Sequence, residues 1–517
     1  MSQLSIDDPR HAANARTILG QPIGLYVLFM VELWERFSYY GMRALLVLFL
    51  AADLTSDNPG FGWDETSALA FYGWYTMLVY VASIPGGILA DKFIGQKRAV
   101  LIGGLLLCAG HIVLAIPGEY AFFSGVTLII LGVGGLKANI SSMVGGLYRR
   151  GDDRRDKGFY LFYIGINIGG FLGPIVTGWV SVKYGWHYGF GLAGIGMLLG
   201  QAAFMMGQKY LVGVGEKPVK RTEAVSSEDK DTSFGELLSQ LFKSPTQLAI
   251  SLILAVGGIY LSVLYASPSE VIGYSLLAVF LALVSGLMMM IYKDINAIEK
   301  DRFVVLLLSF LIVIVFWGAF EQAGGLMNLY AQNKTDLHID FLNFDVPAAW
   351  FQSVNSLFII TLGMIVASIW VWVKRKGFES SSIFKMALGV IIMGLGFGFM
   401  AAAAIEFKNH GESAMIYLVL AYLLHTIGEL CASPVALSFI TKVSPVKYVS
   451  IMMGVYFAAT GLGNKVAGVI GEYSQTRGEL EIFVGLVIFT AIFGLLVILL
   501  LKPLKRLTHG AESAQDE

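Results

Sequence analysis

Long apolar stretches separated by short polar loops run through almost the whole chain. Each stretch is long enough to cross a bilayer as a helix. Hydropathy places fourteen of them at 23–51, 67–91, 98–116, 121–147, 157–183, 188–210, 247–266, 270–292, 303–331, 347–373, 382–405, 413–441, 449–474 and 480–501. An even number of spans leaves both chain ends on one side of the membrane. The pattern predicts an all-α polytopic membrane protein.

Lys and Arg are concentrated in alternate loops. These basic residues are Lys92, Lys97, Arg98, Arg149, Arg150, Arg154, Arg155, Lys157, Lys374, Arg375, Lys376, Lys385, Lys442, Lys447, Lys502, Lys505 and Arg506. The intervening loops, such as 53–65 and 336–345, are acidic or neutral. Because cytoplasmic loops carry an excess of basic residues, we expect both termini to be cytoplasmic. The N-terminal segment lacks a signal-peptide pattern, so the first span is expected to direct insertion.

A charged segment interrupts the apolar pattern near the middle of the chain and reads as a cytoplasmic linker. Six spans precede it and eight follow it, and the first two of these eight contain no ionisable residue before Glu270. We interpret these two as a lipid-facing helix pair, which leaves six plus six helices, the major facilitator architecture. The predicted parts are an N-terminal tail (1–21), a six-helix bundle (22–210), the linker (211–246), the inserted pair (247–292), a second six-helix bundle (293–501) and a C-terminal tail (502–517).

The loop after the second span supports this architecture. It reads Gly87-Ile-Leu-Ala-Asp-Lys-Phe-Ile-Gly-Gln-Lys-Arg98 and resembles the motif of that superfamily between helices 2 and 3. Asp91 is suited to pair with a basic group of a neighbouring helix, and Gly95 allows a tight turn. We expect this loop to be a structural latch.

Composition narrows the class further. The chain is 56% hydrophobic and only 14% charged, whereas soluble domains carry about a quarter charged residues. A formal net charge of −1 gives no indication of nucleic-acid binding. Cys108 and Cys431 both lie in apolar segments, so we expect free thiols and no disulfide framework. The sequence shows no cluster with metal-ligand spacing and predicts neither a metal nor another cofactor.

The first span contains the most informative residues. Glu32, Glu35, Arg36, Tyr39, Tyr40 and Arg43 fall within an arc of roughly 140° on one helix face. Each charge costs about 2.5–3.5 kcal/mol at mid-membrane, so this face must border a wet cavity or charged partners. Purely structural ion pairs between helices are one explanation. A solute or proton pathway is the explanation that we favour.

Other spans add buried polar groups. They are Lys137, Tyr163 and Asn167 in the fourth and fifth spans, Trp317, Glu321 and Asn328 in the ninth, Gln352 and Asn355 in the tenth, His425, Glu429 and Ser433 in the twelfth, and Asn464 and Lys465 in the thirteenth. We expect Lys137 to need a carboxylate partner, and Glu321 suits a group that loads and unloads a proton. Interhelical hydrogen bonding is an equal alternative for Asn167, His425 has no clear function, and Lys465 either pairs or snorkels. Four carboxylates (Glu32, Glu35, Glu321 and Glu429) face three basic groups (Arg36, Arg43 and Lys137). This leaves one excess negative charge (−4 + 3), which Lys465 would cancel if it were counted with them.

Together these motifs resemble the bacterial proton-dependent oligopeptide transporters of the major facilitator superfamily. The matching segments are Glu32-x-x-Glu35-Arg36-Phe-x-Tyr-Tyr-Gly, Gly-Gly-Leu-Lys137-Ala-Asn, Phe162-Tyr163-Ile-Gly-Ile-Asn167-Ile-Gly-Gly, Phe-Glu321-Gln and Gly-Glu429-Leu-Cys-Ala-Ser433-Pro. The similarity extends over both halves, and the inserted pair is also a feature of bacterial relatives.

The resemblance implies roles for individual residues. Glu35, Arg36 and Lys137, with Glu32 beside them, would couple protonation to binding, and Arg36 and Lys137 would attract the carboxylate end of a peptide. Glu429 would face the amine end. Asn167, Asn355 and Ser433 would assist binding, and Tyr39, Tyr40, Tyr80 and Trp317 would line the pocket. Arg43 would pair with Glu321 until Glu321 is protonated.

Three positions depart from the family pattern. Gly73 stands where many relatives carry a helix 2 histidine, Ser356 stands where proline is frequent, and Tyr456 stands where tryptophan is common. Without the histidine, proton coupling would depend on the carboxylates. The other two departures affect fine specificity.

The resulting expectation is proton-coupled import of di- and tripeptides by alternating access, in a bacterial inner membrane and by a monomer embedded in lipid. Import of another small anion such as nitrate is the alternative, although it would leave Glu429 without a counter-charge. A membrane-embedded enzyme would need a catalytic cluster that the sequence lacks. A sensor would need a larger cytoplasmic domain than the linker and tail provide.

Overall fold

The computed structural model describes residues 8, 10–14, 16–149, 152–217 and 234–511. The chain divides into two compact units. The first comprises residues 1–220, 312–435 and 457–499, and the second comprises 221–311, 436–456 and 500–517. Parts of the predicted N-terminal tail, linker and C-terminal tail (1–7, 9, 15, 218–233 and 512–517) lie outside the described residues.

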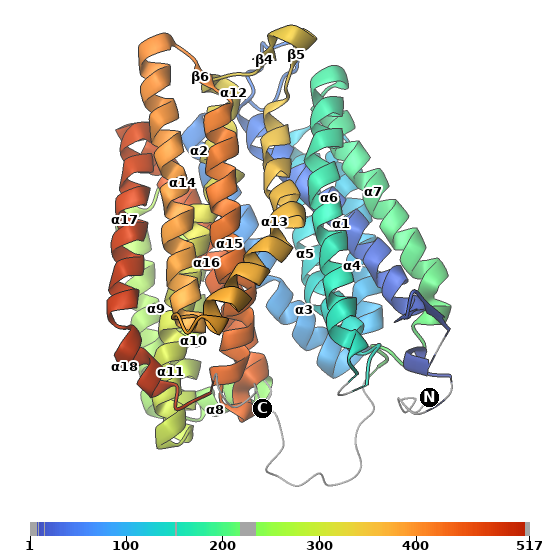
Figure 1. Cartoon of the computed structure of the whole chain (residues 1–517), viewed down its shortest axis with the longest axis vertical. Coiled ribbons are helices and arrows are strands. Elements are labelled where there is room, and N and C mark those ends of the chain that lie inside the picture. Colours follow the sequence, from blue (N-terminus) through green and yellow to red (C-terminus); the bar gives the residue numbers. More distant parts are fainter. Residues whose placement is uncertain (1–7, 9, 15, 150–151, 218–233, 512–517) are drawn as a thin grey trace. The chain divides into compact units, whose positions relative to one another are not determined.

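The first unit is helical and contains most of both predicted bundles (Figure 1). Its helices are α1 (Ile23–Ala51), α2 (Glu65–Val81), α3 (Ser83–Leu89), α4 (Gln96–Leu114), α5 (Glu119–Gly145), α6 (Arg154–Tyr184), α7 (Trp186–Gly207), α12 (Leu326–Lys334), α13 (Phe351–Arg375), α14 (Ser382–His410) and α17 (Glu479–Leu499). Helices α11 (Ala297–Phe320), α15 (Ile416–Val443) and α16 (Val449–Arg477) continue from one unit into the other. In the part of the chain that the structure describes, thirteen helical segments are long and apolar enough to cross a membrane. Helix α1 is as long as these segments, but its charged residues keep it out of the thirteen. With α1 included, the described residues contain the predicted fourteen spans.

Two predicted spans are broken. The span 67–91 consists of α2, α3 and a π-helical turn at Ala90–Ile94. Helix α2 ends at Val81 because Pro85, four residues on, has no N–H to donate to the Val81 carbonyl. The turn ends at Gly95, whose φ of +83° is favourable only for glycine, as the latch motif predicts.

The span 303–331 is also broken, which changes the position of Glu321. Helix α11 stops at Phe320, a 3₁₀ turn covers Glu321–Ala323, and α12 starts again at Leu326. Gly325 lies between this turn and α12. The spacing of Trp317, Glu321 and Asn328 predicts one shared face on a continuous helix, and the break means that this prediction does not hold.

Short strands join loop segments of the first unit. β1 (Thr17–Ile18) pairs antiparallel with β2 (Gln21–Pro22), and β4 (His338–Ile339) pairs antiparallel with β5 (Phe344–Asp345). β3 (Thr335–Asp336) pairs parallel with β6 (Ser413–Ala414). In the β4–β5 hairpin, the Asp345 carboxylate beside His338 raises the pKa of that imidazole.

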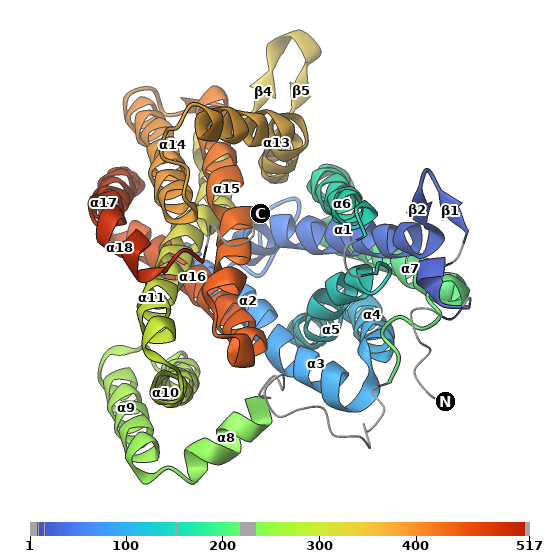
Figure 2. The same cartoon turned by 60° about the horizontal axis from the view of Figure 1, so that its bottom comes forward.

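The second unit contains the inserted pair, α9 (Pro245–Tyr265) and α10 (Val271–Asp294), with the short helices α8 (Phe234–Phe242) and α18 (Leu501–Leu507). Helix α8 leads into α9, and α10 packs beside α9 (Figure 2). Only 11% of the α9 span and 17% of the α10 span are buried, consistent with the lipid-facing interpretation. Helix α8 was not predicted from the sequence, because the charged residues around it favour a linker.

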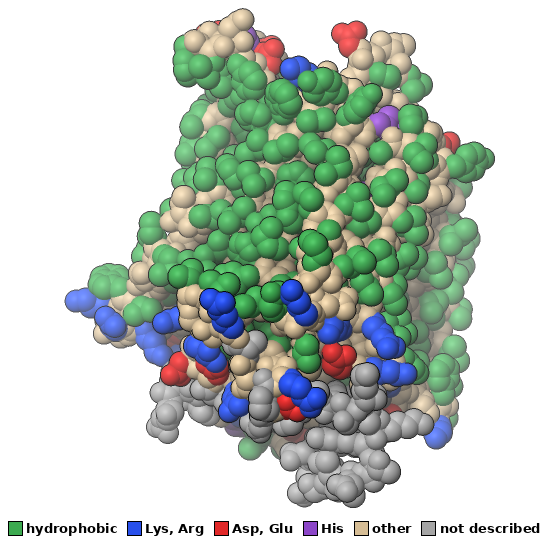
Figure 3. Space-filling view, turned by 90° about the vertical axis from the view of Figure 1, so that its right-hand side faces the viewer, with side chains coloured by type: hydrophobic (Ala, Val, Ile, Leu, Met, Phe, Trp, Pro, Cys, Tyr) green, Lys and Arg blue, Asp and Glu red, His purple; other side chains and the backbone are tan. Residues whose placement is uncertain are grey.

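Hydrophobic side chains form a broad band on the face drawn in Figure 3, and Lys and Arg side chains gather along its lower edge. This distribution is expected of a protein surrounded by lipid with basic loops on one side.

Candidate functional site

The charged face of α1 is buried within the first unit. Arg36 Nε donates a hydrogen bond to Glu32 Oε1 at 3.0 Å and lies 2.5 Å from Glu35 Oε2. The second contact is an ion pair without hydrogen-bond geometry, because both Glu35 oxygens lack a hydrogen-bond partner among the described residues. Glu35 is 0% exposed and Arg36 is 5% exposed. One guanidinium is thus shared by two carboxylates.

Helix α6 can approach α1 closely because it presents glycine there. A Cβ on Gly169 would clash with the Leu33 carbonyl and lie 2.9 Å from the Arg36 Cβ. Gly165 and Gly173, one turn to either side, face Phe29 and Phe37 of α1 in the same way. This contact fixes the part of α1 that carries Arg36.

Aromatic rings connect the basic groups of the site. The Arg36 guanidinium lies 5.4 Å from the Tyr39 ring centroid and 6.0 Å from that of Tyr40, and Arg43 lies 4.9 Å from Tyr40. Such contacts contribute about 0.5–2 kcal/mol each, more where water is excluded. Tyr39 and Tyr40 therefore hold cations as well as lining the site.

Lys137 on α5 lies against an aromatic ring. Its Nζ is 3.4 Å from the Tyr80 ring centroid, and within the described ranges it makes no ion pair. Glu32 and Glu35 lie within Coulombic range of it. The expected direct carboxylate partner of Lys137 is therefore replaced by the face of Tyr80, which leaves the ammonium group available to a ligand.

Arg43 and Glu321 form the predicted ion pair. Arg43 Nη1 is 2.9 Å from Glu321 Oε1, and Arg43 Nη2 donates to Gln352 Oε1 at 3.0 Å. The Tyr72 hydroxyl donates to the same Glu321 oxygen at 2.5 Å. This cluster joins α1, α2, the 3₁₀ turn after α11, and α13.

The sequence analysis did not identify Tyr72, and it noted Gln352 only as a polar group. A sequence signal for Tyr72 was weak because a tyrosine in an apolar helix usually packs in the core. The structure shows that Gly324 makes room for this side chain, since a Cβ there would clash with the Tyr72 hydroxyl.

Glu429 lies on a different wall of the site. Asn355 Nδ2 on α13 donates to Glu429 Oε2 at 2.8 Å and to Thr426 Oγ1 at 3.1 Å. Both Asn355 and Glu429 are partly exposed, so this carboxylate is accessible to a ligand. Ser433 follows one turn later on α15 and is also partly exposed.

In the part of the chain that the structure describes, Asn167, Trp317 and His425 make no hydrogen bond or ion pair with the charged groups named above. Asn167 donates to the Tyr163 carbonyl of its own helix at 2.9 Å, which fits a structural role. Trp317 packs edge to face against Phe316 and Phe320. Both ring nitrogens of buried His425 lack a hydrogen-bond partner among the described residues, and its ring lies 4.5 Å from that of Phe397.

Lys465 pairs rather than snorkels. It is 2% exposed, and its Nζ lies 3.3 Å from Glu472 Oε1 and 4.7 Å from the Trp74 ring centroid. Because Glu472 neutralises it locally, Lys465 does not cancel the excess negative charge of the site.

This chain is similar in sequence to known proteins. The sequence model of the POT family matches residues 97–477. A peptide transporter of Yersinia enterocolitica is 36% identical over 97% of this chain and 98% of its own length. A di-/tripeptide transporter of Lactococcus lactis is 34% identical over 95% of this chain and 97% of its own.

Solved structures show the same fold. A crystal structure of the peptide transporter POT with sulfate aligns with a TM-score of 0.79 and 35% identity, covering 97% of this chain and 99% of that one. A POT family transporter solved with a thioalcohol-conjugated peptide also has a TM-score of 0.79, at 29% identity over 94% of this chain and 98% of that one. The fold is that of the major facilitator superfamily. This chain is a multi-pass membrane protein that belongs to the POT family of transporters.

Proposed function

We propose that this protein imports di- and tripeptides together with protons, by alternating access across a bacterial inner membrane. The observation that carries this proposal is the separation of charge in the site. Arg36 and Lys137 lie on helices of the first bundle, and Glu429 lies on α15. A short peptide carries one negative and one positive end, and this arrangement matches both.

The names of the relatives support a peptide cargo. The Lactococcus lactis relative is a di-/tripeptide transporter, and one aligned structure holds a conjugated peptide. A nitrate importer would gain nothing from a carboxylate held accessible by Asn355. This argument favours peptide over a simple anion.

Proton coupling is proposed to depend on two carboxylate clusters. Glu32 and Glu35 share Arg36, and Glu321 is paired with Arg43 in a buried position. Protonation of Glu321 would remove its attraction for Arg43, because a neutral carboxyl group no longer balances the guanidinium. The contact between the two bundles would then loosen and the site would open.

The test is uptake of radiolabelled dialanine into proteoliposomes with and without an inward proton gradient and membrane potential. Accumulation above the external concentration only with the gradient is expected, since each charge gains about 2.3 kcal/mol per 100 mV. Unlabelled trialanine should compete, and nitrate should not. Gradient-independent uptake, or competition by nitrate alone, would contradict the proposal.

A further inference from the structure

The C-terminal half of α13 is bent away from the direction of its first half (Figure 1). Thr361 and Ser368 both donate side-chain hydrogen bonds to carbonyls four residues back, at 2.9 and 2.7 Å, and Gly363 lies between them. Such back-bonding and glycine are recognised causes of helix bending. Only 17% of the α13 span is buried, the same share as for the lipid-facing helix α10.

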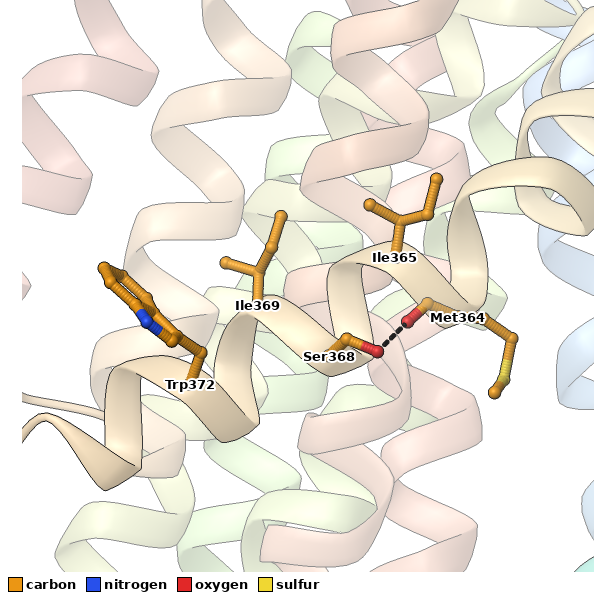
Figure 4. Close-up of a pocket in the computed structure, with 5 residues that line it drawn as sticks. All are labelled: Met364, Ile365, Ser368, Ile369 and Trp372. Carbon is orange, nitrogen blue, oxygen red and sulfur yellow. Dashed lines mark hydrogen bonds between the residues drawn. The ribbon is translucent and has the colours of Figure 1, made fainter.

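The bent half carries a shallow, open apolar hollow on its surface. Its lining consists of Met364, Ile365, Ser368, Ile369 and Trp372, which lie along one side of α13 (Figure 4). The Ser368 hydroxyl is already used by the Met364 carbonyl, so the hollow offers almost no polar contact. It therefore suits an acyl chain lying along the helix.

Positive charge begins where the hollow ends. Lys374, Arg375 and Lys376 begin two residues after Trp372 and are all exposed. Lys385 of α14 lies nearby, with its Nζ 5.1 Å from the Trp370 ring centroid. These four basic residues and the acidic Glu379 of the connecting loop have a formal net charge of +3 (4 − 1).

We propose that this side of α13 is a binding site for an anionic phospholipid. The acyl chain would occupy the hollow, Trp372 would lie at the level of the headgroup, and Lys374, Arg375 and Lys376 would contact the phosphate. A basic cluster beside a membrane helix attracts anionic lipid, and a tryptophan favours the interface.

The bound lipid is expected to affect transport because α13 also reaches the site. Gln352 of α13 contacts Arg43, and Asn355 of α13 contacts Glu429. A lipid that holds the bent half of α13 would therefore restrict the helix that carries both contacts.

The site is tested by tryptophan quenching in vesicles that contain brominated phosphatidylglycerol or, at the same mole fraction, brominated phosphatidylcholine. The contribution of Trp372 is the difference between the unmodified protein and Trp372→Phe. We expect Trp372 to be quenched more strongly by the anionic lipid. Equal quenching by the two lipids would overturn the proposal.

A matched pair of variants separates a specific site from general surface charge. Lys374→Gln/Arg375→Gln/Lys376→Gln should lower the preference for the anionic lipid about five-fold for each charge removed. Lys502→Gln/Lys505→Gln/Arg506→Gln, which changes the same number of basic residues elsewhere, should leave the preference unchanged. An equal loss in both variants would show that bulk charge attraction alone accounts for the binding. Dialanine uptake should respond to phosphatidylglycerol content in the unmodified protein and lose that response in the first variant only.

Discussion

At the residue scale, the site depends on charges that are held in place without being fully neutralised. Glu429 receives hydrogen-bond support from Asn355 yet stays partly exposed, and Lys137 rests on the Tyr80 ring. Arg36 is different because two carboxylates compete for it. Protonating one of them would free part of the guanidinium for a substrate carboxylate.

Glu429→Gln tests the assignment of the peptide amine. We expect about 10- to 100-fold weaker binding of dialanine, because a hydrogen bond to a charged group contributes about 1.5–3 kcal/mol. An analogue that lacks the amine should lose far less, as measured by competition against labelled dialanine. Glu412→Gln, a change at an exposed glutamate, is the control. Equal losses for both ligands would contradict the assignment.

Tyr72→Phe tests the hydroxyl that supports the Arg43–Glu321 pair. Its loss should lower the thermal unfolding midpoint in detergent, because Glu321 loses a charge-assisted hydrogen bond. Tyr75→Phe is a closely matched control, since the buried Tyr75 hydroxyl lacks a partner among the described residues. The hypothesis fails if the two variants shift the midpoint equally.

At the element scale, glycine and proline determine which helices touch and which helices break. The α1–α6 contact at Gly169 shows a position where any larger residue would separate the two helices. The breaks after Val81 and Phe320 were not predicted, because hydropathy is continuous across both. The residues that mark these breaks in the sequence are Pro85 and the Gly324-Gly325 pair.

Gly169→Ala is expected to lower both the unfolding midpoint and dialanine uptake, because its Cβ would meet the Leu33 carbonyl, which cannot move aside. Gly485→Ala on α17 is the control, since a Cβ there meets nothing within 4 Å. An added methyl group in an exposed helical position should stabilise the helix by about 0.5–1 kcal/mol. Opposite signs for the two variants are expected, and a harmless Gly169→Ala would contradict the packing argument.

The pair of Lys465 and Glu472 is expected to behave as one unit. In a double-mutant cycle of Lys465→Met and Glu472→Gln, the coupling free energy should be about 0.5–3 kcal/mol, as for other residues in direct contact. Unfolding midpoints of the two single variants and the double variant provide the measurement. Strict additivity would show that the contact contributes nothing.

At the scale of the whole molecule, hydropathy and basic loops predicted almost the entire helical arrangement. Among the described residues, thirteen helical segments have the length and hydropathy of a span and α1 adds the fourteenth, and the inserted pair has the low burial expected of it. The sequence could place Arg43 opposite Glu321 only through a family resemblance, because contacts between distant helices leave no local pattern. The Tyr72 and Gln352 contacts required the structure for the same reason.

Membrane orientation can be tested by cysteine labelling, because Cys108 and Cys431 are both buried. Asp57→Cys should react with an impermeant maleimide in intact cells, since Asp57 lies in an acidic, exposed loop. Lys376→Cys should react only after the membrane is permeabilised. The reverse pattern would place the termini outside the cell.

The break at Glu321 also interrupts the hydrogen-bond ladder of a helix within its predicted span. A helix that ends within the membrane normally leaves peptide groups without hydrogen-bond partners. Here the Tyr422 hydroxyl donates to the Ala323 carbonyl at 3.2 Å, and Gln322 Nε2 donates to the Ala467 carbonyl at 3.0 Å. The Ala323 carbonyl at the interruption is therefore satisfied by a side chain of α15, and the Gln322 side chain ties the turn to α16. Glu321, the carboxylate on which the proposed proton coupling depends, is also the first residue of this 3₁₀ turn, so a proton that arrived there would act at the interruption itself.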